Sequence, residues 1–349
     1  MSFLRSAKLA LLRASRSSSL YRVAAASRWR SSRLLILCYH GVALEDEHQW
    51  QSNTFISAPD LESRLRYLRD EKYEVLPLGE GIRRLTTGSL PPRSVVITFD
   101  DGFYNFKERA WPLLQNYGFP ATLYLTTFYS TYNRPIFRLC CSYMLWRNRD
   151  KTIGPAASLG IPRAMSLATR WHRELVLRLL TRYATANDSS AADKDALAQG
   201  LARILGFDFE WLLRRRLLHL MKPDEVAELA VKGLDVQLHT HRHRTPLDRD
   251  LFQKEIRDNR NWILDCTGKD PVHFCYPSGQ CQRVFFPWLS EMRVATATTC
   301  QPAFATSASN PLMLPRYLDG SDKPLVEVEG WLTGFATLLP RKSFEPPMQ

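Results

Sequence analysis

Short apolar runs alternate with helix-like segments along most of the chain. Residues 34–39, 94–99 and 122–126 are continuous apolar and β-branched runs, which are typical of strands covered on both faces. Between them, residues 58–72 and 106–117 place apolar side chains at helical spacing. This order of strand, helix and strand predicts parallel βα units.

A Leu- and Arg-rich stretch then interrupts the pattern. Residues 130–222 show helical spacing without strand-like runs, so we expect a mainly helical insertion and not a second catalytic unit. The βα pattern resumes after it, with helices predicted at 223–232 and 250–267 and strands at 234–238 and 272–276. We therefore expect residues 34–349 to form a single α/β domain with this insertion inside it.

The positive charge of the chain is concentrated at its N-terminus. The 349 residues include 47 Lys and Arg against 35 Asp and Glu, a formal charge of +12, but residues 1–33 hold eight of the basic residues and no acidic one. The rest of the chain therefore carries only +4, which disfavours a nucleic-acid enzyme with basic stripes over its body. We interpret residues 1–33 as a disordered basic, Ser/Arg-rich tail that resembles a transit peptide; a surface-binding arm and a start-site artefact are the alternatives.

Two further features bear on location. No uninterrupted apolar run reaches the about 18 residues of a conventional membrane-spanning helix. The seven cysteines form no CxxC pair, which argues against a disulfide framework or a cysteine-based zinc site. We expect a cytoplasmic or peripherally membrane-associated protein, with any membrane contact made through the basic tail or the helical insertion.

Polar residues gather where the predicted strands end. Asp100 and Asp101 follow one buried strand, and His239, with His243 four residues later, follows another. Because functional groups of parallel α/β barrels gather at the C-terminal ends of the strands, we expect these residues to form one site. Two imidazoles and one carboxylate can hold a zinc-type ion and leave positions open for water and substrate. Taken separately, the segments are also compatible with an Asp-Gly turn and a surface His pair.

Several segments resemble the motifs of a known family, the polysaccharide deacetylases, also called NodB-homology or carbohydrate esterase family 4 proteins. They are VVITFDDGFYNF at 95–106, LDVQLHTHRHRTPL at 234–247 and HFCYPSGQ at 273–280, with divergent ILCYHGV and LPR segments near the two ends. The resemblance implies an α/β fold of the distorted (β/α)7-barrel type. It also implies a metal-dependent hydrolase that removes N-acetyl or related acyl groups from amino sugars, at amide bonds other than peptide bonds.

The same resemblance implies roles for individual residues. Asp100 would be the catalytic base, while Asp101, His239 and His243 would hold a divalent metal, most commonly Zn²⁺, with Co²⁺ or Ni²⁺ as alternatives. The residues expected around the substrate and the oxyanion are Phe103, Tyr276, Pro277, Ser278 and Arg316. The implied partner is an acetylated amino-sugar glycan or glycolipid.

The chain departs from the family pattern at two functional positions. The third motif of the family often carries an Arg that orients the base, and here Cys275 occupies that position, so Arg316 is a candidate to replace it. The late His that supplies the general acid has no counterpart, because no His follows His273. His40, at the end of the first predicted strand, is a candidate to protonate the leaving amine; a structural role is its alternative.

Because the general acid of the family is missing, two functions other than an amino-sugar deacetylase stay open. One is a catalytically inert relative that binds metal and glycan without hydrolysing the acyl group. Another keeps the chemistry but acts on a different acyl group or on a lipid-linked sugar.

Overall fold

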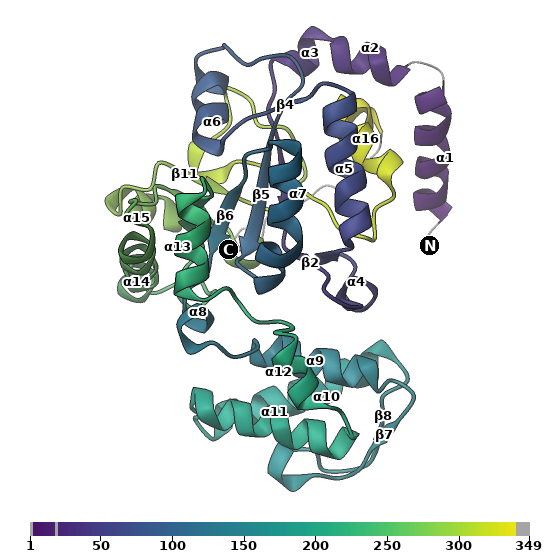
Figure 1. Ribbon diagram of the computed structural model, residues 1–349, viewed down its shortest axis with the longest axis vertical. Helices are drawn as coiled ribbons and strands as arrows, with labels where there is room; N and C mark the ends of the chain where they lie inside the picture. Colours follow the sequence, from purple (N-terminus) through teal and green to yellow (C-terminus); the bar gives the residue numbers. More distant parts are fainter. Residues whose placement is uncertain (1–2, 18–19, 340–349) are drawn as a thin grey trace. The chain divides into compact units, whose positions relative to one another are not determined.

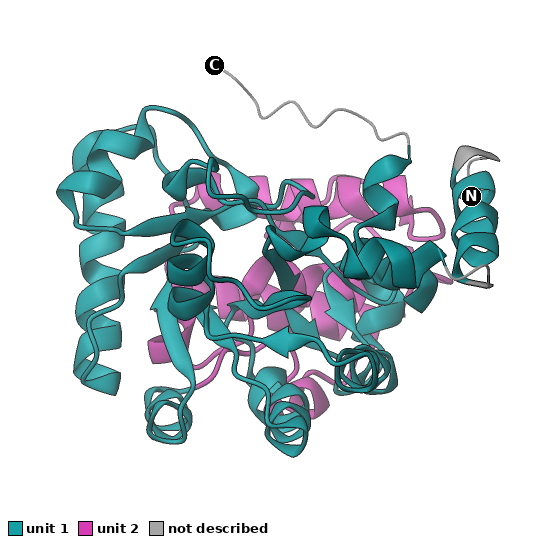
Figure 2. Ribbon diagram, turned by 90° about the horizontal axis from the view of Figure 1, so that it is seen from above, with its two compact units in different colours: residues 1–128, 222–349 teal, residues 129–221 magenta. Residues whose placement is uncertain are grey.

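A computed structural model describes residues 3–17 and 20–339 of the chain (Figure 1). The chain divides into two compact units, coloured separately in Figure 2. Unit 1 comprises residues 1–128 and 222–349, and unit 2 comprises residues 129–221, the stretch in which the sequence predicts an insertion over 130–222. Within the described ranges, no helix has the length and apolar character needed to cross a membrane.

Unit 1 is built on a sheet whose strands all pair in parallel. Along the described chain the sheet has eight strands in the order β11-β10-β9-β6-β5-β1-β12, with β4 also paired to β5. The strands are β1 (Leu35–Tyr39), β4 (Glu74–Val75), β5 (Ser94–Asp101), β6 (Thr122–Leu125), β9 (Asp235–Leu238), β10 (His273–Cys275), β11 (Thr296–Thr298) and β12 (Tyr317–Leu318). A separate parallel pair joins β2 (Gly41–Val42) to β3 (Phe55–Ile56).

The two edges of this sheet meet through the segment that precedes β12. Leu314 forms a parallel bridge to Thr298 at the end of β11, and three residues later Tyr317 pairs with Leu37 of β1. The sheet therefore curls into a distorted parallel barrel, as the sequence predicts. All strand C-termini then lie at one end of the barrel, where polar side chains from distant segments can meet.

Helices cover the outside of the barrel (Figure 1). They are α4 (Glu47–Trp50), α5 (Ala58–Asp70), α6 (Leu78–Thr86), α7 (Trp111–Tyr117), α13 (Pro223–Val231), α14 (Arg249–Thr267), α15 (Phe285–Glu291) and α16 (Leu325–Thr333). The predicted helix at 106–117 begins as a π-helical turn, Phe106–Ala110, and continues as α7. Pro112 lies at the junction of the two segments, in the first turn of α7, and a Pro within a continuous helix removes one backbone N–H donor to the preceding turn.

The N-terminal basic segment corrects the sequence-based expectation of a disordered tail. It forms α1 (Phe3–Ser17), α2 (Leu20–Ala26) and α3 (Arg28–Ser31), and α1 and α2 pack on α16. Leu12 is fully buried, and Gly330 lets it approach, since a Cβ there would lie 2.9 Å from Leu12 Cδ2. Lys8 pairs with Glu327 at 3.1 Å and Arg16 with Glu329 at 3.0 Å. Helix α16 thus supplies the acidic partners that the segment itself lacks.

Unit 2 is mainly helical. Its elements are α9 (Phe137–Arg147), α10 (Arg170–Ala186), α11 (Ala191–Leu205), α12 (Phe209–Arg214) and a small antiparallel pair of β7 (Thr152–Ile153) and β8 (Met165–Ser166). A short helix, α8 (Phe128–Tyr132), lies at the boundary with unit 1. Helix α9 packs on both α10 and α11 and buries Cys140, Cys141 and Met144.

Candidate active site

The barrel brings the polar residues predicted at strand ends to one place. Asp100 and Asp101 end β5, His239 directly follows β9, and Arg316 directly precedes β12. His243 belongs to the loop after His239, and its ring centroid lies 4.9 Å from that of His239. The site therefore combines side chains from the C-terminal ends of β5 and β9, as expected for a parallel barrel, with Arg316, which extends into it from the start of β12.

Three of these residues converge on a common point. Asp101 Oδ1 lies 3.3 Å from His239 Nε2 and 3.3 Å from His243 Nε2, and the three ligand atoms lie within 4.8 Å of one another. Asp101 Oδ1 is buried and receives no hydrogen bond of good geometry. A buried carboxylate oxygen without a donor, facing two imidazole nitrogens, is the donor set that a zinc-type ion uses. The residues therefore fit a divalent metal, and we call Asp101, His239 and His243 the metal-binding triad.

The Asp101 carboxylate is held in its charged form. Burial by itself raises the pKa of Asp101, but the neighbouring His239 and His243 outweigh this effect and lower the pKa to about 2. Asp101 is therefore an anion at neutral pH. Only the ionised carboxylate can serve as a metal ligand without first releasing a proton.

The backbone around these ligands adopts conformations that are uncommon for residues with side chains. Asp101, Thr240 and His243 have φ values of 71°, 63° and 54°. Gly102 follows with φ 89°, and a Cβ there would overlap Leu125 Cδ1. Such left-handed residues cost free energy and persist where the surrounding structure holds them. Here they turn the Asp101 carboxylate and the His243 imidazole towards each other.

Hydrogen bonds from outside the triad orient His239. Its Nδ1 lies 2.8 Å from the Cys275 carbonyl oxygen, so an Nδ1 proton is donated there and the Nε2 lone pair faces Asp101. Its backbone N–H donates to Asn259 Oδ1 at 2.9 Å. The same Asn259 amide donates to the Leu125 carbonyl at 2.9 Å and to Thr127 Oγ1 at 3.1 Å. Asn259, which is fully buried on α14, thus ties the end of β9 to the end of β6.

A second residue of α14 anchors the rest of the histidine loop. The Glu255 carboxylate accepts hydrogen bonds from Arg242 N at 2.8 Å and Arg244 Nε at 2.7 Å, and the Glu255 backbone carbonyl accepts from His241 N at 3.1 Å. His241 Nδ1 bonds Thr127 Oγ1 at 2.8 Å, so this histidine supports the loop and is not a ligand.

Asn259 and Glu255 are supporting residues of the site that were not among the predicted ones. A signal for them exists, because both lie on the buried face of α14 among apolar residues at helical spacing. The buried residues of that helix are Phe252, Glu255, Ile256, Asn259 and Ile263. Polar side chains on such a face need hydrogen-bond partners inside the protein.

Replacing Asn259 with Ala is expected to weaken metal binding about 10- to 100-fold, because partners that orient a ligand typically contribute this much to affinity. Competition titration of purified protein against a chromogenic chelator measures the effect. Asn261, exposed on the same helix, provides the matched control, and Asn261→Ala is expected to bind metal like the parent. Equal metal affinity of the two variants would contradict the positioning role of Asn259.

Asp100 and Arg316 form a buried ion pair beside the triad. Arg316 Nη1 and Nη2 each lie 2.7 Å from one Asp100 carboxylate oxygen. The guanidinium also donates to Thr299 O at 3.0 Å and Thr98 Oγ1 at 3.1 Å. Burial raises the pKa of Asp100, but the Arg316 guanidinium outweighs it and holds the pKa well below its usual range. Asp100 is therefore charged at neutral pH in an orientation fixed by two parallel hydrogen bonds.

The geometry revises one predicted role and supports another. Arg316 is fully buried, so its guanidinium is not exposed to a substrate, contrary to its predicted place among the substrate-binding residues. Cys275, at the position where the family often has Arg, lies with Sγ 2.9 Å from Arg316 Nη2 and 3.4 Å from Asp100 Oδ2. From the start of β12, Arg316 therefore contacts the Asp100 carboxylate, the same group that an Arg side chain at position 275 would lie beside.

The remaining predicted residues differ in how far they face the site. His40 Nε2 lies 3.9 Å from Asp100 Oδ2, with the side chain 20% exposed. The Phe103 ring is buried against Phe55. Tyr276 is also buried, and its hydroxyl donates to the Leu312 carbonyl at 2.9 Å, so packing turns both rings inwards. The predicted oxyanion contact near Phe103 is a backbone N–H, and it stays a prediction.

The turn after β10 presents one exposed side chain. Pro277 is buried, whereas Ser278 is exposed and has a left-handed backbone with φ 56°. Of the predicted third-motif residues, Ser278 is therefore the one whose side chain is open to solvent.

Comparisons with known proteins agree with this geometry. The family model described as polysaccharide deacetylase matches residues 87–145 and 181–296, which together make up half of the chain. A poly-β-1,6-N-acetyl-D-glucosamine N-deacetylase of Escherichia coli (strain K12) is 32% identical over 95 residues, covering 27% of this chain and 14% of that protein. The match thus spans a small part of this relative's length.

Solved structures show the same fold. The Streptococcus pyogenes deacetylase PplD, solved in complex with acetate, has a TM-score of 0.53 at 18% identity, over 81% of this chain and 91% of that one. IcaB from Ammonifex degensii has a TM-score of 0.53 at 17% identity, over 86% of this chain and 97% of that one. The matched motifs, the barrel and the arrangement of side chains at its strand ends lead to one conclusion: this chain belongs to the polysaccharide deacetylase family.

Proposed function

We propose that this protein is a metal-dependent hydrolase that removes N-acetyl groups from the amino sugars of a polysaccharide or glycolipid. The convergence of Asp101, His239 and His243 beside the charged, buried Asp100 carries this proposal. Because the E. coli relative is named for poly-β-1,6-N-acetyl-D-glucosamine, we propose a polymer of N-acetylated glucosamine as the first substrate to test.

Asp101, His239 and His243 would hold the divalent ion, with Zn²⁺ as the first candidate and Co²⁺ or Ni²⁺ as alternatives. When bound there, such an ion polarises an acyl carbonyl and increases the acidity of a water molecule. His239 is oriented for this role by its hydrogen bond to the Cys275 carbonyl.

Asp100 would act as the general base. Its carboxylate is ionised and held by Arg316, so it can accept a proton from the attacking water at a fixed position. His40, 3.9 Å from Asp100 Oδ2, would donate a proton to the leaving amine. Backbone N–H groups near Phe103 and Ser278 would stabilise the oxyanion.

The decisive experiment measures acetate release from poly-β-1,6-N-acetylglucosamine by protein loaded with Zn²⁺. We expect release to stop on removal of the metal with a chelator and to return when Zn²⁺ is added back. His239→Gln and His243→Gln are expected to lose both bound metal and activity, since each removes one of three ligands.

His172→Gln serves as the matched control, because His172 lies in unit 2 on α10 and bonds Thr169 there. Metal content and acetate release of this variant should both stay at the parental level. Binding of metal and oligosaccharide without acetate release, across amino-sugar polymers and small acetyl esters, would instead identify an inert relative that binds glycan.

We also propose a cytoplasmic or peripherally membrane-associated location, with the membrane contact made by the basic N-terminal helices and not by unit 2. The described part of unit 2 contains a pocket of ≈ 470 Å³, but Asp193, Asn187 and Arg203 line it. Such a polar lining does not favour contact with lipid.

A further inference from the structure

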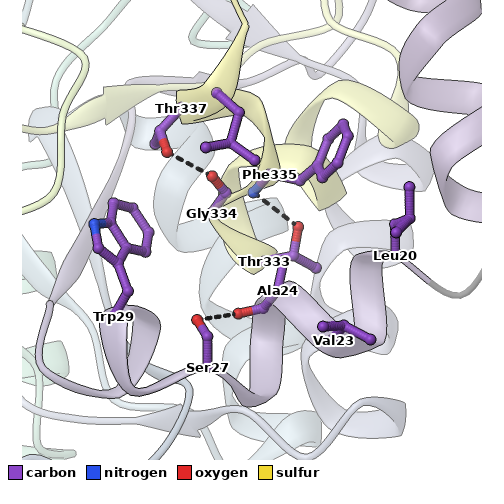
Figure 3. A pocket seen from close by; sticks show the side chains of 10 residues that line it. Leu20, Val23, Ala24, Ser27, Trp29, Thr333, Gly334, Phe335 and Thr337 are labelled. Atoms are coloured by element: carbon purple, nitrogen blue, oxygen red, sulfur yellow. Dashed lines mark hydrogen bonds between the residues drawn. The ribbon is translucent and has the colours of Figure 1, made fainter.

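An apolar pocket lies where the N-terminal helices meet the end of α16 (Figure 3). Its volume is ≈ 320 Å³. Leu20, Val23 and Trp29 line one side, and Phe335 and Leu338, from the short 3₁₀ helix after α16, line the other. None of the described residues that line it is charged. The pocket is thus built from both ends of the described chain. The neighbouring α3 contacts the start of β5 through Arg30, which donates to the Ser94 carbonyl at 2.9 Å, whereas the active-site Asp100 and Asp101 lie at the other end of that strand.

The polar groups of this pocket bond within the protein. Ser27 Oγ donates to the Ala24 carbonyl at 2.7 Å, and Thr337 Oγ1 donates to the Gly334 carbonyl at 2.7 Å. Phe335 N–H donates to Thr333 Oγ1 at 3.4 Å, and Figure 3 shows all three bonds. Because these groups are already used, the pocket favours a ligand that is apolar where it enters.

The side chains around the pocket are exposed to an unusual degree for apolar residues. Val23 is 68% exposed and Leu338 is 74% exposed, while Leu20 and Trp29 are 48% and 41% exposed. A group of exposed apolar side chains around a hollow marks an interaction site more often than a free surface. We call these four residues the apolar rim.

Basic residues border the apolar rim beside Trp29. Arg28 is exposed on α3 next to Trp29, and the Arg33 guanidinium lies 4.4 Å from the centroid of the Trp29 ring. Residues 1–33 contain no acidic residue, and the acidic Glu71 and Glu329 lie with Arg22 around a separate pocket, so no acidic residue of the described chain lines the apolar pocket itself. An apolar pocket edged by cations suits a ligand with an apolar chain and an anionic head, as in anionic lipids.

We propose that the apolar rim, together with Arg28 and Arg33, docks on an anionic lipid bilayer and that the pocket receives a lipid acyl chain. Trp29 would lie at the interface, where aromatic rings are favoured, and the arginines would contact the headgroups. This inference locates the membrane contact of the proposed function, and it does not depend on deacetylation, because vesicle binding is measured without glycan.

Co-sedimentation of the full chain with vesicles tests the proposal. We expect the protein to pellet with phosphatidylcholine vesicles that contain phosphatidylglycerol and to stay in the supernatant with phosphatidylcholine alone. High salt should weaken the binding, because it screens the headgroup charge. The double variant Arg28→Glu/Arg33→Glu should bind at least about tenfold more weakly, since each cation near the surface contributes to attraction.

Variants of the rim separate lipid contact from folding. Val23→Asp and Leu338→Asp should each weaken binding at least about tenfold, because they place a charge where an apolar side chain would enter the bilayer. Val231→Asp is the matched control, since Val231 is 89% exposed on α13, away from the pocket. Both rim residues are exposed, so the variants should keep the parental thermal unfolding temperature and the parental acetate release.

Several outcomes would overturn the proposal without touching the proposed deacetylation. Equal recovery of the parent in the supernatant with both kinds of vesicle would do so. Equal loss of vesicle binding in Val231→Asp and Val23→Asp would also overturn it. Binding that appears only after removal of residues 340–349 would show that this segment, and not lipid, occupies the pocket of the full chain.

Discussion

Asp100→Asn is expected to lower acetate release about 10²- to 10⁴-fold, the range that a positioned general base contributes. Asn retains the shape of Asp but cannot accept a proton from water. Because Asp100 is not one of the three converging ligands, the bound metal should remain. Acetate release by Zn²⁺-loaded protein and metal content of the same sample together measure the effect.

The neighbouring carboxylate supplies the matched control for this result. Asp101→Asn removes a converging ligand, so metal and activity should be lost together, whereas Asp100→Asn should lose activity alone. Asp100 also neutralises Arg316, so the folded fraction of each variant must be checked by circular dichroism at the assay temperature. Acetate release at the parental rate by folded Asp100→Asn would exclude Asp100 as the base.

The residues that sequence reasoning located share one property: their place follows from local pattern. Asp100, Asp101 and His239 end apolar runs, and the end of a parallel strand determines at which end of a barrel a side chain lies. The direction in which a side chain points does not follow from local pattern. Tyr276 lies in the predicted segment, yet its hydroxyl points to Leu312, and no pattern around position 276 indicates that contact.

The N-terminal helices show why the tail was misinterpreted. Their basic residues find acidic partners at Glu327 and Glu329 on α16, about 300 positions along the chain from Lys8 and Arg16. The composition of residues 1–33 does not indicate that these acidic partners exist elsewhere in the chain. Asn259 was missed for a related reason, because its importance comes from three hydrogen bonds to segments outside its own helix.

Arg316→Ala is expected to lower the free energy of unfolding by about 3–5 kcal/mol, because it leaves the Asp100 carboxylate buried without its partner. Urea unfolding monitored by circular dichroism measures this loss. In the protein that remains folded, kcat should fall while metal content stays at the parental level, since Arg316 contacts the base and not the triad. Arg316→Lys should recover part of both losses, because it retains the charge but not the paired hydrogen bonds.

A second-site change distinguishes a positioning role from a general contribution to stability. Cys275 Sγ lies 3.4 Å from Asp100 Oδ2, at the position where relatives often carry Arg, and removing the Arg316 side chain opens space beside it. Adding Cys275→Arg to Arg316→Ala should therefore return a guanidinium to Asp100 from β10 and raise kcat above that of Arg316→Ala alone. If Arg316→Ala retains parental kcat and stability, the buried pair does not position the base. If the double variant regains the free energy of unfolding but its kcat stays low, a guanidinium from β10 stabilises the fold without orienting Asp100. In that case the base points at the metal-binding triad only when the guanidinium comes from position 316.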